Sequence, residues 1–296
     1  MLSGDQFFSA EARVAQVAER LTNCDLCPRN CGVNRSSGEK GICQGGALPK
    51  IFAYHPHWGE EFLLSGKRGS GTIFFSGCNM KCVYCQNYEI SQEGKGREIT
   101  IEHLRNIMLF LEQAGCHNVN LVTPTHFAPQ IFSAVLLAQK RGLTIPIVYN
   151  TVGYERVEIL REWRGLVDIY LPDMRYASGE SSERYSGVAD YPEVNQQAVL
   201  EMYRQVGEVD VVNGVAEKGL IIRILLLPGL EDEARTTLTF IANEISRKVF
   251  ISLMRQYRPL FRAFEFPELS RTISDAKYRE LVQFARRLGL ENLILQ

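Results

Sequence analysis

Six segments in succession combine a short apolar strand with a following helix, and this alternation constrains the fold more than any other feature. The strands are expected at about 72–76, 118–122, 146–150, 167–171, 220–227 and 249–254. Such alternation is typical of a parallel sheet with right-handed crossovers. Six units are too few to close an eight-stranded barrel, so the sequence predicts an α/β fold with a partial, TIM-like (βα)6 barrel.

Residues 1–70 follow a different pattern, and we expect them to form a small cysteine-rich extension to a barrel domain at 71–296. A helix is expected from Ser9 to Leu21, because Ser9 can cap it and apolar residues recur on one face. Residues 23–46 are rich in Cys, Gly, Asn and Arg and lack a periodic pattern. Short strands are expected after them at Lys50–Tyr54 and Glu61–Leu64.

Composition excludes several classes of function. The 296 residues are 45% hydrophobic with a formal net charge of −1, and no long basic run gives a nucleic-acid signal. The longest apolar stretches have the length of strands, and the N-terminus lacks the basic and apolar regions of a signal peptide. We therefore expect a cytoplasmic protein without a membrane partner.

Seven of the eight cysteines fall into two tight clusters, at positions 24, 27, 31 and 43 and at positions 78, 82 and 85. Thiols of cytosolic proteins stay reduced, so such clusters indicate metal ligands rather than disulfides. Cys116 stands alone and is expected to be a small buried apolar residue.

The second cluster is a C-x3-C-x2-C loop directly after the first barrel strand. Cys78, Cys82 and Cys85 can hold three corners of a [4Fe–4S] cubane. Since no fourth cysteine lies nearby in the sequence, one iron would be open to another ligand. The alternative is a zinc loop with a distant fourth ligand, although zinc sites favour paired C-x2-C knuckles.

Polar residues follow the other barrel strands, where parallel barrels gather their chemistry. Arg223 lies within an apolar strand, where a cation needs a partner or a cavity, and an ion pair inside the barrel would also satisfy it. His126 can equally be a structural histidine, and Asp173 can be a turn residue. The candidates at strand ends are Thr123, Thr125, His126, Asn150, Asp173, Arg175, Gln256 and Tyr257.

The first cluster has the spacing C-x2-C-x3-C-x11-C. Its four thiolates, Cys24, Cys27, Cys31 and Cys43, make a closed site for either zinc or an all-cysteine [4Fe–4S] cluster. The segment has little apolar content, so we expect it to fold when its metal binds.

The C-x3-C-x2-C loop, with Tyr84 before the last cysteine, resembles the signature of the radical S-adenosylmethionine (SAM) superfamily. The resemblance implies that the open iron binds SAM and that one electron cleaves it to methionine and a 5′-deoxyadenosyl radical, which abstracts hydrogen. It also implies an electron donor such as flavodoxin or ferredoxin. In this interpretation SAM is held by Tyr84, Thr123, Thr125, Asn150, Asp173 and Arg223, and His126, Arg175, Gln256 and Tyr257 are catalytic or substrate-side candidates.

Two further strings resemble pyruvate-formate-lyase-activating-enzyme-like proteins of this superfamily. Residues 171–175, Leu-Pro-Asp-Met-Arg, resemble the Asp-x-Lys segment of glycyl-radical-enzyme activases, with Arg175 in place of Lys. The string Cys27-Pro-Arg-Asn-Cys-Gly-Val-Asn-Arg35 resembles the N-terminus of one subgroup. The resemblance implies that a glycyl radical enzyme is a candidate substrate. The alternatives are a radical enzyme acting on a small molecule, a peptide or RNA, and, more remotely, a non-catalytic iron–sulfur or zinc protein.

The sequence departs from the superfamily at one place. The Gly-Gly-Glu-type stretch that usually follows the second strand in that family is replaced here by residues 122–129, which contain no acidic residue.

Overall fold

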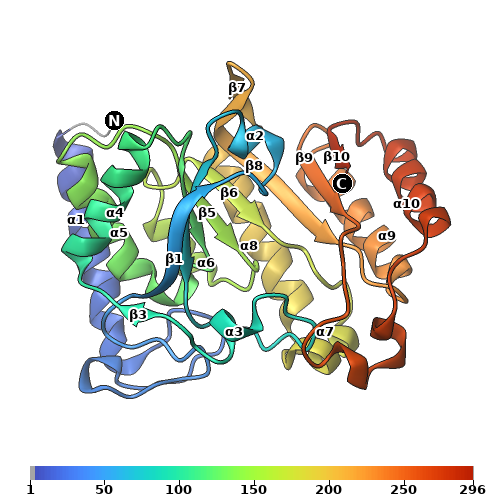
Figure 1. Cartoon of the computed structure of the whole chain (residues 1–296), viewed down its shortest axis with the longest axis horizontal. Coiled ribbons are helices and arrows are strands. Elements are labelled where there is room, and N and C mark those ends of the chain that lie inside the picture. Colours follow the sequence, from blue (N-terminus) through green and yellow to red (C-terminus); the bar gives the residue numbers. More distant parts are fainter. Residues whose placement is uncertain (1–3, 296) are drawn as a thin grey trace.

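A single sheet forms the centre of the molecule, and most helices lie outside it (Figure 1). The computed structural model describes residues 4–295. The strand order is β10-β9-β8-β6-β5-β4-β2-β1-β3, with β7 paired to β8. The strands are β1 (Lys50–His57), β2 (Ser70–Phe75), β3 (Arg97–Glu98), β4 (Val119–Val122), β5 (Ile147–Thr151), β6 (Ile169–Pro172), β7 (Asp210–Val212), β8 (Val215–Leu225), β9 (Phe250–Met254) and β10 (Leu293–Leu295).

The helices follow the strands as the sequence pattern predicts. They are α1 (Gly4–Glu19), α2 (Phe62–Ser65), α3 (Tyr88–Ser91), α4 (Ile101–Gln113), α5 (Ala128–Gln139), α6 (Val157–Glu162), α7 (Gly179–Ser186), α8 (Tyr191–Val206), α9 (Glu231–Phe240) and α10 (Asp275–Arg287). Short helical turns complete the chain: η1 (Arg20–Asn23), η2 (Arg35–Ser37), η3 (Thr125–Phe127), η4 (Ile241–Ile245), η5 (Ala263–Glu265) and η6 (Pro267–Ser270). Thr100 and Ser274 cap α4 and α10 through their hydroxyls.

The predicted parallel barrel is confirmed. Strands β2, β4, β5, β6, β8 and β9 pair in parallel in the predicted order, and β10 adds a further parallel strand beside β9. Every residue of β5 and β6 is buried, because sheet neighbours and helices cover both faces. The β6–β8 ladder is short, pairing Ile169 with Gly219 and Tyr170 with Leu220. The carboxyl ends of these strands point to the same side.

The N-terminal residues extend the same sheet. Strand β1 pairs antiparallel with β2, β3 pairs with β1, and α1 packs against α5. The prediction of a strand at Glu61–Leu64 was wrong, because α2 occupies Phe62–Ser65 and Gly66 ends it with an N–H bond to Phe62 O. In so short an apolar run, hydrophobic periodicity does not distinguish a strand from a helix. Within residues 4–295 no helix has the length and apolar character needed to cross a membrane.

Candidate functional site

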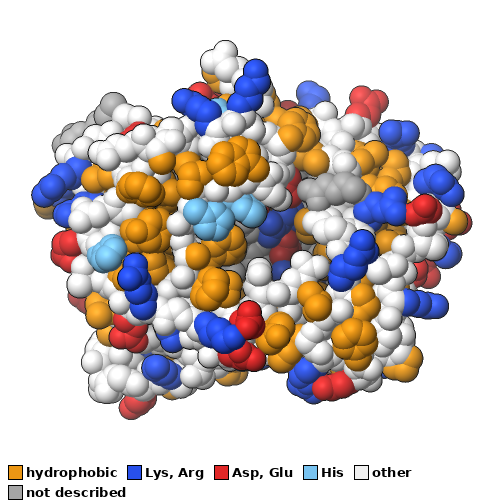
Figure 2. All heavy atoms as spheres, in the orientation of Figure 1, with side chains coloured by type: hydrophobic (Ala, Val, Ile, Leu, Met, Phe, Trp, Pro, Cys, Tyr) orange, Lys and Arg blue, Asp and Glu red, His pale blue; other side chains and the backbone are white. Residues whose placement is uncertain are grey.

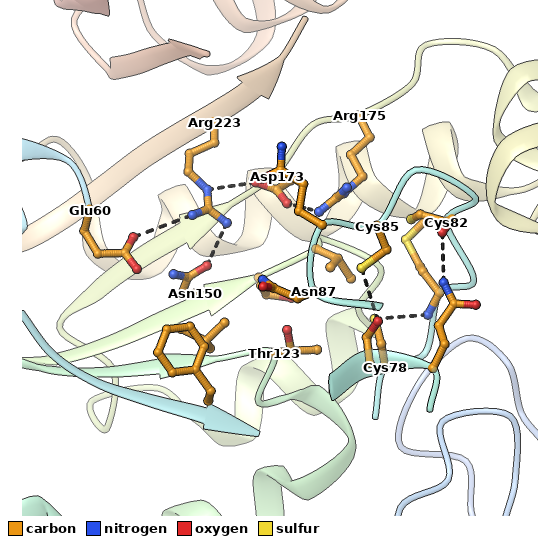
Figure 3. A pocket seen from close by; sticks show the side chains of 18 of the residues that line it. Glu60, Cys78, Cys82, Cys85, Asn87, Thr123, Asn150, Asp173, Arg175 and Arg223 are labelled. Carbon is orange, nitrogen blue, oxygen red and sulfur yellow. Dashed lines mark hydrogen bonds and ion pairs between the residues drawn. The ribbon is translucent and has the colours of Figure 1, made fainter. Parts of the chain in front are cut away.

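A cavity of about 390 Å³ lies at the carboxyl ends of the parallel strands. Figure 2 shows the molecule hollowed near the centre of the face drawn, with acidic and basic side chains in the depth of the hollow. The predicted residues that line the cavity are Cys78, Cys82, Cys85, Thr123, Asn150, Asp173, Arg175 and Arg223. The structure thus brings together side chains from the cysteine loop and from the ends of β4, β5, β6 and β8 (Figure 3).

Five predicted residues are not among those that line this cavity. Thr125 donates to Glu155 Oε1 at 2.6 Å, and His126 Nε2 donates to Ser76 O at 2.8 Å. Burial lowers the pKa of His126 to about 3, so its imidazole is neutral. The other three are Tyr84, which bonds another tyrosine, Tyr257, which donates to Leu269 O at 2.7 Å, and Gln256, which is exposed.

The cavity also contains residues that the sequence patterns did not indicate. His57, Gly59, Glu60 and Phe74 come from β1, β2 and the loop between β1 and α2. The only hint was a run of histidines and acids in 55–61, because sequence alone does not reveal that an antiparallel strand pairs with β2 and places the following loop beside the amino end of that strand. The remaining lining residues are Met80, Gln86, Asn87, Ser91, Gln92, Val122, Thr151 and Val152.

The three thiols have the donor chemistry that an iron–sulfur cluster requires. Cys78 and Cys82 are buried and Cys85 is half-buried, and burial raises the pKa of Cys78 to about 12 and that of Cys85 above its usual value. A metal that binds the sulfur offsets this cost of ionisation. In the part of the chain described, no three His, Cys, Asp or Glu side chains converge on a single-ion site. In a cubane each thiolate binds its own iron, so the sulfurs need only surround the cluster.

Arg223 is the centre of a buried polar network opposite the cysteines (Figure 3). Its Nε donates to Asp173 Oδ1 at 2.8 Å and its Nη2 to Asn150 Oδ1 at 2.7 Å. Arg175 Nη2 binds the second oxygen of Asp173. Glu60 Oε2 lies 3.7 Å from Arg223 Nη1, and burial raises the pKa of Glu60 to about 7 despite this cation. The buried cation predicted within β8 therefore has partners, and it borders a cavity as well.

Thr123 reaches the cavity with a strained backbone. Its φ is +59°, a left-handed conformation that is unfavourable for a β-branched residue. Thr123 directly follows β4, and its N–H still donates to Asn150 O of the neighbouring strand at 2.8 Å. The chain turns away from the sheet at this residue. A strained backbone conformation persists only where the surrounding contacts hold the residue in place, and such residues are often found at functional sites.

The four N-terminal cysteines lie in the loops between η1 and β1. Cys24, Cys27 and Cys43 are buried and Cys31 is half-buried. Burial raises the pKa of Cys27 to about 12, and Cys31 Sγ lies 3.7 Å from Cys24 O. The buried Arg35 donates to His126 O at 2.6 Å and lies 3.9 Å from Cys24 Sγ.

The two cysteine segments touch each other. Arg29 Nε donates to Asn79 O at 2.8 Å, next to Cys78. On the other side of Cys78, Gly77 has a φ of +89°, and a Cβ placed on it would lie 2.2 Å from Cys43 O. Only glycine allows so close an approach of two backbones.

Fold and cavity define a parallel partial barrel with a three-cysteine loop at its mouth, and the sequence matches the corresponding family model. The model of the radical SAM superfamily matches residues 72–241, which is more than half of the chain. The chain belongs to the radical SAM superfamily. Membership implies a [4Fe–4S] cluster and SAM as cofactors.

Particular relatives extend this comparison. An uncharacterized protein of Methanocaldococcus jannaschii is 29% identical over 290 residues, which cover 91% of this chain and 76% of that protein. A protein of the same organism, provisionally named a glycyl-radical enzyme activating enzyme, is 33% identical over 94 residues, covering 32% of this chain and 38% of its own length. The crystal structure of HydG, a maturase of the FeFe-hydrogenase, is similar in fold, with a TM-score of 0.50 and 15% identity over 74% of this chain and 48% of HydG.

Proposed function

We propose that Cys78, Cys82 and Cys85 bind a [4Fe–4S] cluster whose open iron takes SAM, and that the chain uses this pair for hydrogen abstraction. Cluster and SAM together supply a 5′-deoxyadenosyl radical, which takes a hydrogen atom from the substrate. One observation carries the proposal. Three thiols of a single loop line the same cavity as polar side chains from the ends of four parallel strands.

The chain's own residues hold and shield the cofactor in this proposal. A guanidinium binds carboxylates through its N–H groups, and Arg223, whose Nε and Nη2 already bond Asp173 and Asn150, would meet the carboxylate of SAM through Nη1. Asn150 and Thr123 offer neutral polar groups beside it. The apolar side chains of Phe74 and Val152 line the cavity as well, and they would exclude water from a radical.

The test is the product of SAM cleavage. The anaerobically reconstituted chain, reduced with dithionite, is expected to form 5′-deoxyadenosine, and the triple variant Cys78→Ala/Cys82→Ala/Cys85→Ala is expected to lose both its cluster iron and the product. Cys116→Ala is the matched control, because Cys116 is buried outside both clusters and should leave iron and product unchanged. A wild-type chain that binds iron but forms no product contradicts the chemistry. A triple variant that keeps all its iron contradicts the ligand assignment.

The proposed hydrogen donor is a backbone glycine of a partner protein, as in glycyl-radical-enzyme activation. Support comes from the Asp173-x-Arg175 segment, which lies in the cavity, and from the name of the second M. jannaschii relative. The measurement is the electron paramagnetic resonance (EPR) signal of a glycyl radical when the reduced chain and SAM are mixed with a candidate glycyl radical enzyme. If no candidate gains the signal while 5′-deoxyadenosine forms, a small molecule, peptide or RNA becomes the favoured substrate.

We also propose that Cys24, Cys27, Cys31 and Cys43 bind a second metal, zinc or a [4Fe–4S] cluster. No three of these thiols converge on one ion in the described chain, so zinc would require the loops to close further, whereas the sulfurs of a cubane need only surround it. The packing of Cys31 Sγ 3.7 Å from Cys24 O, and the contact of Arg35 with Cys24, support a common site. Metal and sulfide analysis of a Cys24→Ala/Cys27→Ala variant tests it, because loss of zinc identifies one metal and loss of iron and sulfide the other.

A low-potential donor such as flavodoxin or ferredoxin would deliver the electron that the cluster at Cys78, Cys82 and Cys85 uses to cleave SAM.

A further inference from the structure

A chain of hydrogen-bonding groups runs from Cys82 into the interior of the protein. Ser186 Oγ lies 3.0 Å from Cys82 Sγ, Tyr176 OH lies 2.7 Å from Ser186 Oγ, and Tyr84 OH lies 2.7 Å from Tyr176 OH. None of the four side chains is more than 6% exposed. Ser186, Tyr176 and Tyr84 have almost no exposed surface, so their hydroxyls have to bond one another or the Cys82 sulfur.

Binding of Cys82 to iron would fix the direction of this chain. A metal-bound thiolate has no proton to donate, and each hydroxyl has only one. Ser186 must therefore use its hydrogen on Cys82 Sγ, which leaves Ser186 Oγ to accept from Tyr176. Tyr176 then accepts from Tyr84. All three O–H groups point toward the sulfur.

The other two sulfurs have simpler surroundings. Cys78 Sγ accepts from Met80 N at 3.4 Å, and Cys85 Sγ lies 3.1 Å from Ser91 Oγ. The contact to Cys82 is the shortest of the three, and two further hydroxyls stand behind it. Hydrogen bonds in series polarise one another, so the last bond gains strength from those behind it.

We propose that Ser186, Tyr176 and Tyr84 form a polarised hydrogen-bond chain that raises the reduction potential of the cluster bound through Cys82. Hydrogen bonds to the sulfurs are among the factors that set the potential of an iron–sulfur cluster, because they stabilise its more negative, reduced form. Reduction by the electron donor becomes easier, and the driving force for passing the electron to SAM becomes smaller. The inference rests on the proposed function only in taking Cys82 as a cluster ligand.

The experiment is an EPR-monitored redox titration of the full chain after anaerobic reconstitution. Ser186→Ala, Tyr176→Phe and Tyr84→Phe are each expected to move the midpoint potential to more negative values. The shift should be largest for Ser186→Ala, which removes the donor to sulfur, and smallest for Tyr84→Phe at the far end. Tyr185→Phe is the matched control. Its ring stacks on Tyr176 with centroids 6.5 Å apart, but its hydroxyl bonds Glu268 instead.

Iron content separates this inference from the proposed function. Cys82→Ala is expected to lose cluster iron, and if it keeps all its iron, the ligand assignment fails. Wild-type iron and an unchanged potential in both Ser186→Ala and Tyr176→Phe overturn the inference alone. An equal shift in Tyr185→Phe and Tyr176→Phe also overturns it, because packing would then be the cause. If Ser186→Ala binds no cluster, Tyr176→Phe decides the test, since it keeps the ring and leaves Ser186 in place.

Discussion

Arg223 Nε donates a 2.8 Å hydrogen bond to Asp173 Oδ1, and the same two residues form an isolated parallel bridge between β8 and the end of β6. The regular β6–β8 ladder ends at Tyr170 and Leu220. The ion pair between Asp173 and Arg223 therefore holds β6 and β8 together beyond the end of their ladder, at the edge of the cavity. Asp173 also binds Arg175, so one buried carboxylate lies between two cations.

Replacement of Arg223 by lysine should separate charge from geometry. Lysine keeps the positive charge but cannot bond Asn150 and Asp173 in the planar arrangement of a guanidinium. We expect the chain to lose about 1.5–3 kcal/mol of folding free energy, the contribution of one hydrogen bond to a charged group. We also expect an increase of roughly tenfold in the Kd for SAM, equivalent to about 1.4 kcal/mol. Denaturant titration and equilibrium dialysis measure the two quantities.

Arg204→Lys is the matched control for this prediction. Like Arg223, Arg204 donates from Nε and Nη2, in this case to the two carboxylate oxygens of Glu201, but it lies on α8 away from the cavity. Its replacement should leave the affinity for SAM unchanged. An unchanged affinity in Arg223→Lys would contradict the role assigned to Arg223.

The sequence predicted the barrel well because its signals are local. Strand-helix alternation depends on neighbouring residues, and so does the spacing of the cysteine loop. The residues that the sequence missed depend on tertiary contacts. Glu60 enters the cavity only because β1 pairs antiparallel with β2, which places the following loop beside the amino end of β2, from where the Glu60 side chain reaches the cavity.

His126 illustrates the opposite difficulty. It follows a barrel strand, as cavity residues do, but the turn at η3 directs its imidazole to Ser76 O. Residue type and position along the chain cannot reveal that rotation. Asn150, Asp173 and Arg223 were easier, because side chains near the carboxyl ends of adjacent parallel strands lie close together regardless of the conformation of the loops that follow.

Thr123 offers a test of backbone strain. Alanine is normally more compatible with folded structure than glycine, but at a φ of +59° a Cβ atom is unfavourable and glycine is not. Thr123→Gly should therefore be more stable than Thr123→Ala by about 1 kcal/mol, in thermal or denaturant unfolding. Both variants remove the same hydroxyl, so both should weaken SAM binding to the same extent. If Thr123→Ala is the more stable variant, the strain is absent in solution.

Glu155 predicts a pH dependence of stability. Burial raises its pKa from 4.5 to about 7, although three hydroxyls donate to the carboxylate, those of Tyr149, Thr125 and Thr151. The folded chain therefore holds this proton more tightly than the unfolded chain. Its contribution to stability must fall as the pH rises from about 4.5 to 7.

Glu155→Gln isolates that contribution, because the amide keeps the shape and cannot ionise. At pH 4.5 the two chains should unfold with similar free energies. At pH 8 the variant should be more stable by up to about 3 kcal/mol, from roughly 1.4 kcal/mol per pKa unit. The measurement is denaturant unfolding across this range. A difference between the chains that does not change with pH would show that Glu155 ionises normally.

Gly77 tests the contact between the two cysteine segments. An alanine Cβ would lie 2.2 Å from Cys43 O, so Gly77→Ala must push the N-terminal cysteine loop away from the C-x3-C-x2-C loop. We expect a loss of about 2–4 kcal/mol, of which about 1 kcal/mol comes from the positive φ and the rest from the clash. Metal analysis should show lower iron content in the cluster at Cys78. Gly142→Ala is the control, because Gly142 has a φ of +96° and no atom within 4 Å of an added Cβ. It shares the backbone cost without the clash and should keep its iron, whereas equal effects of the two substitutions would mean that the loops do not depend on each other.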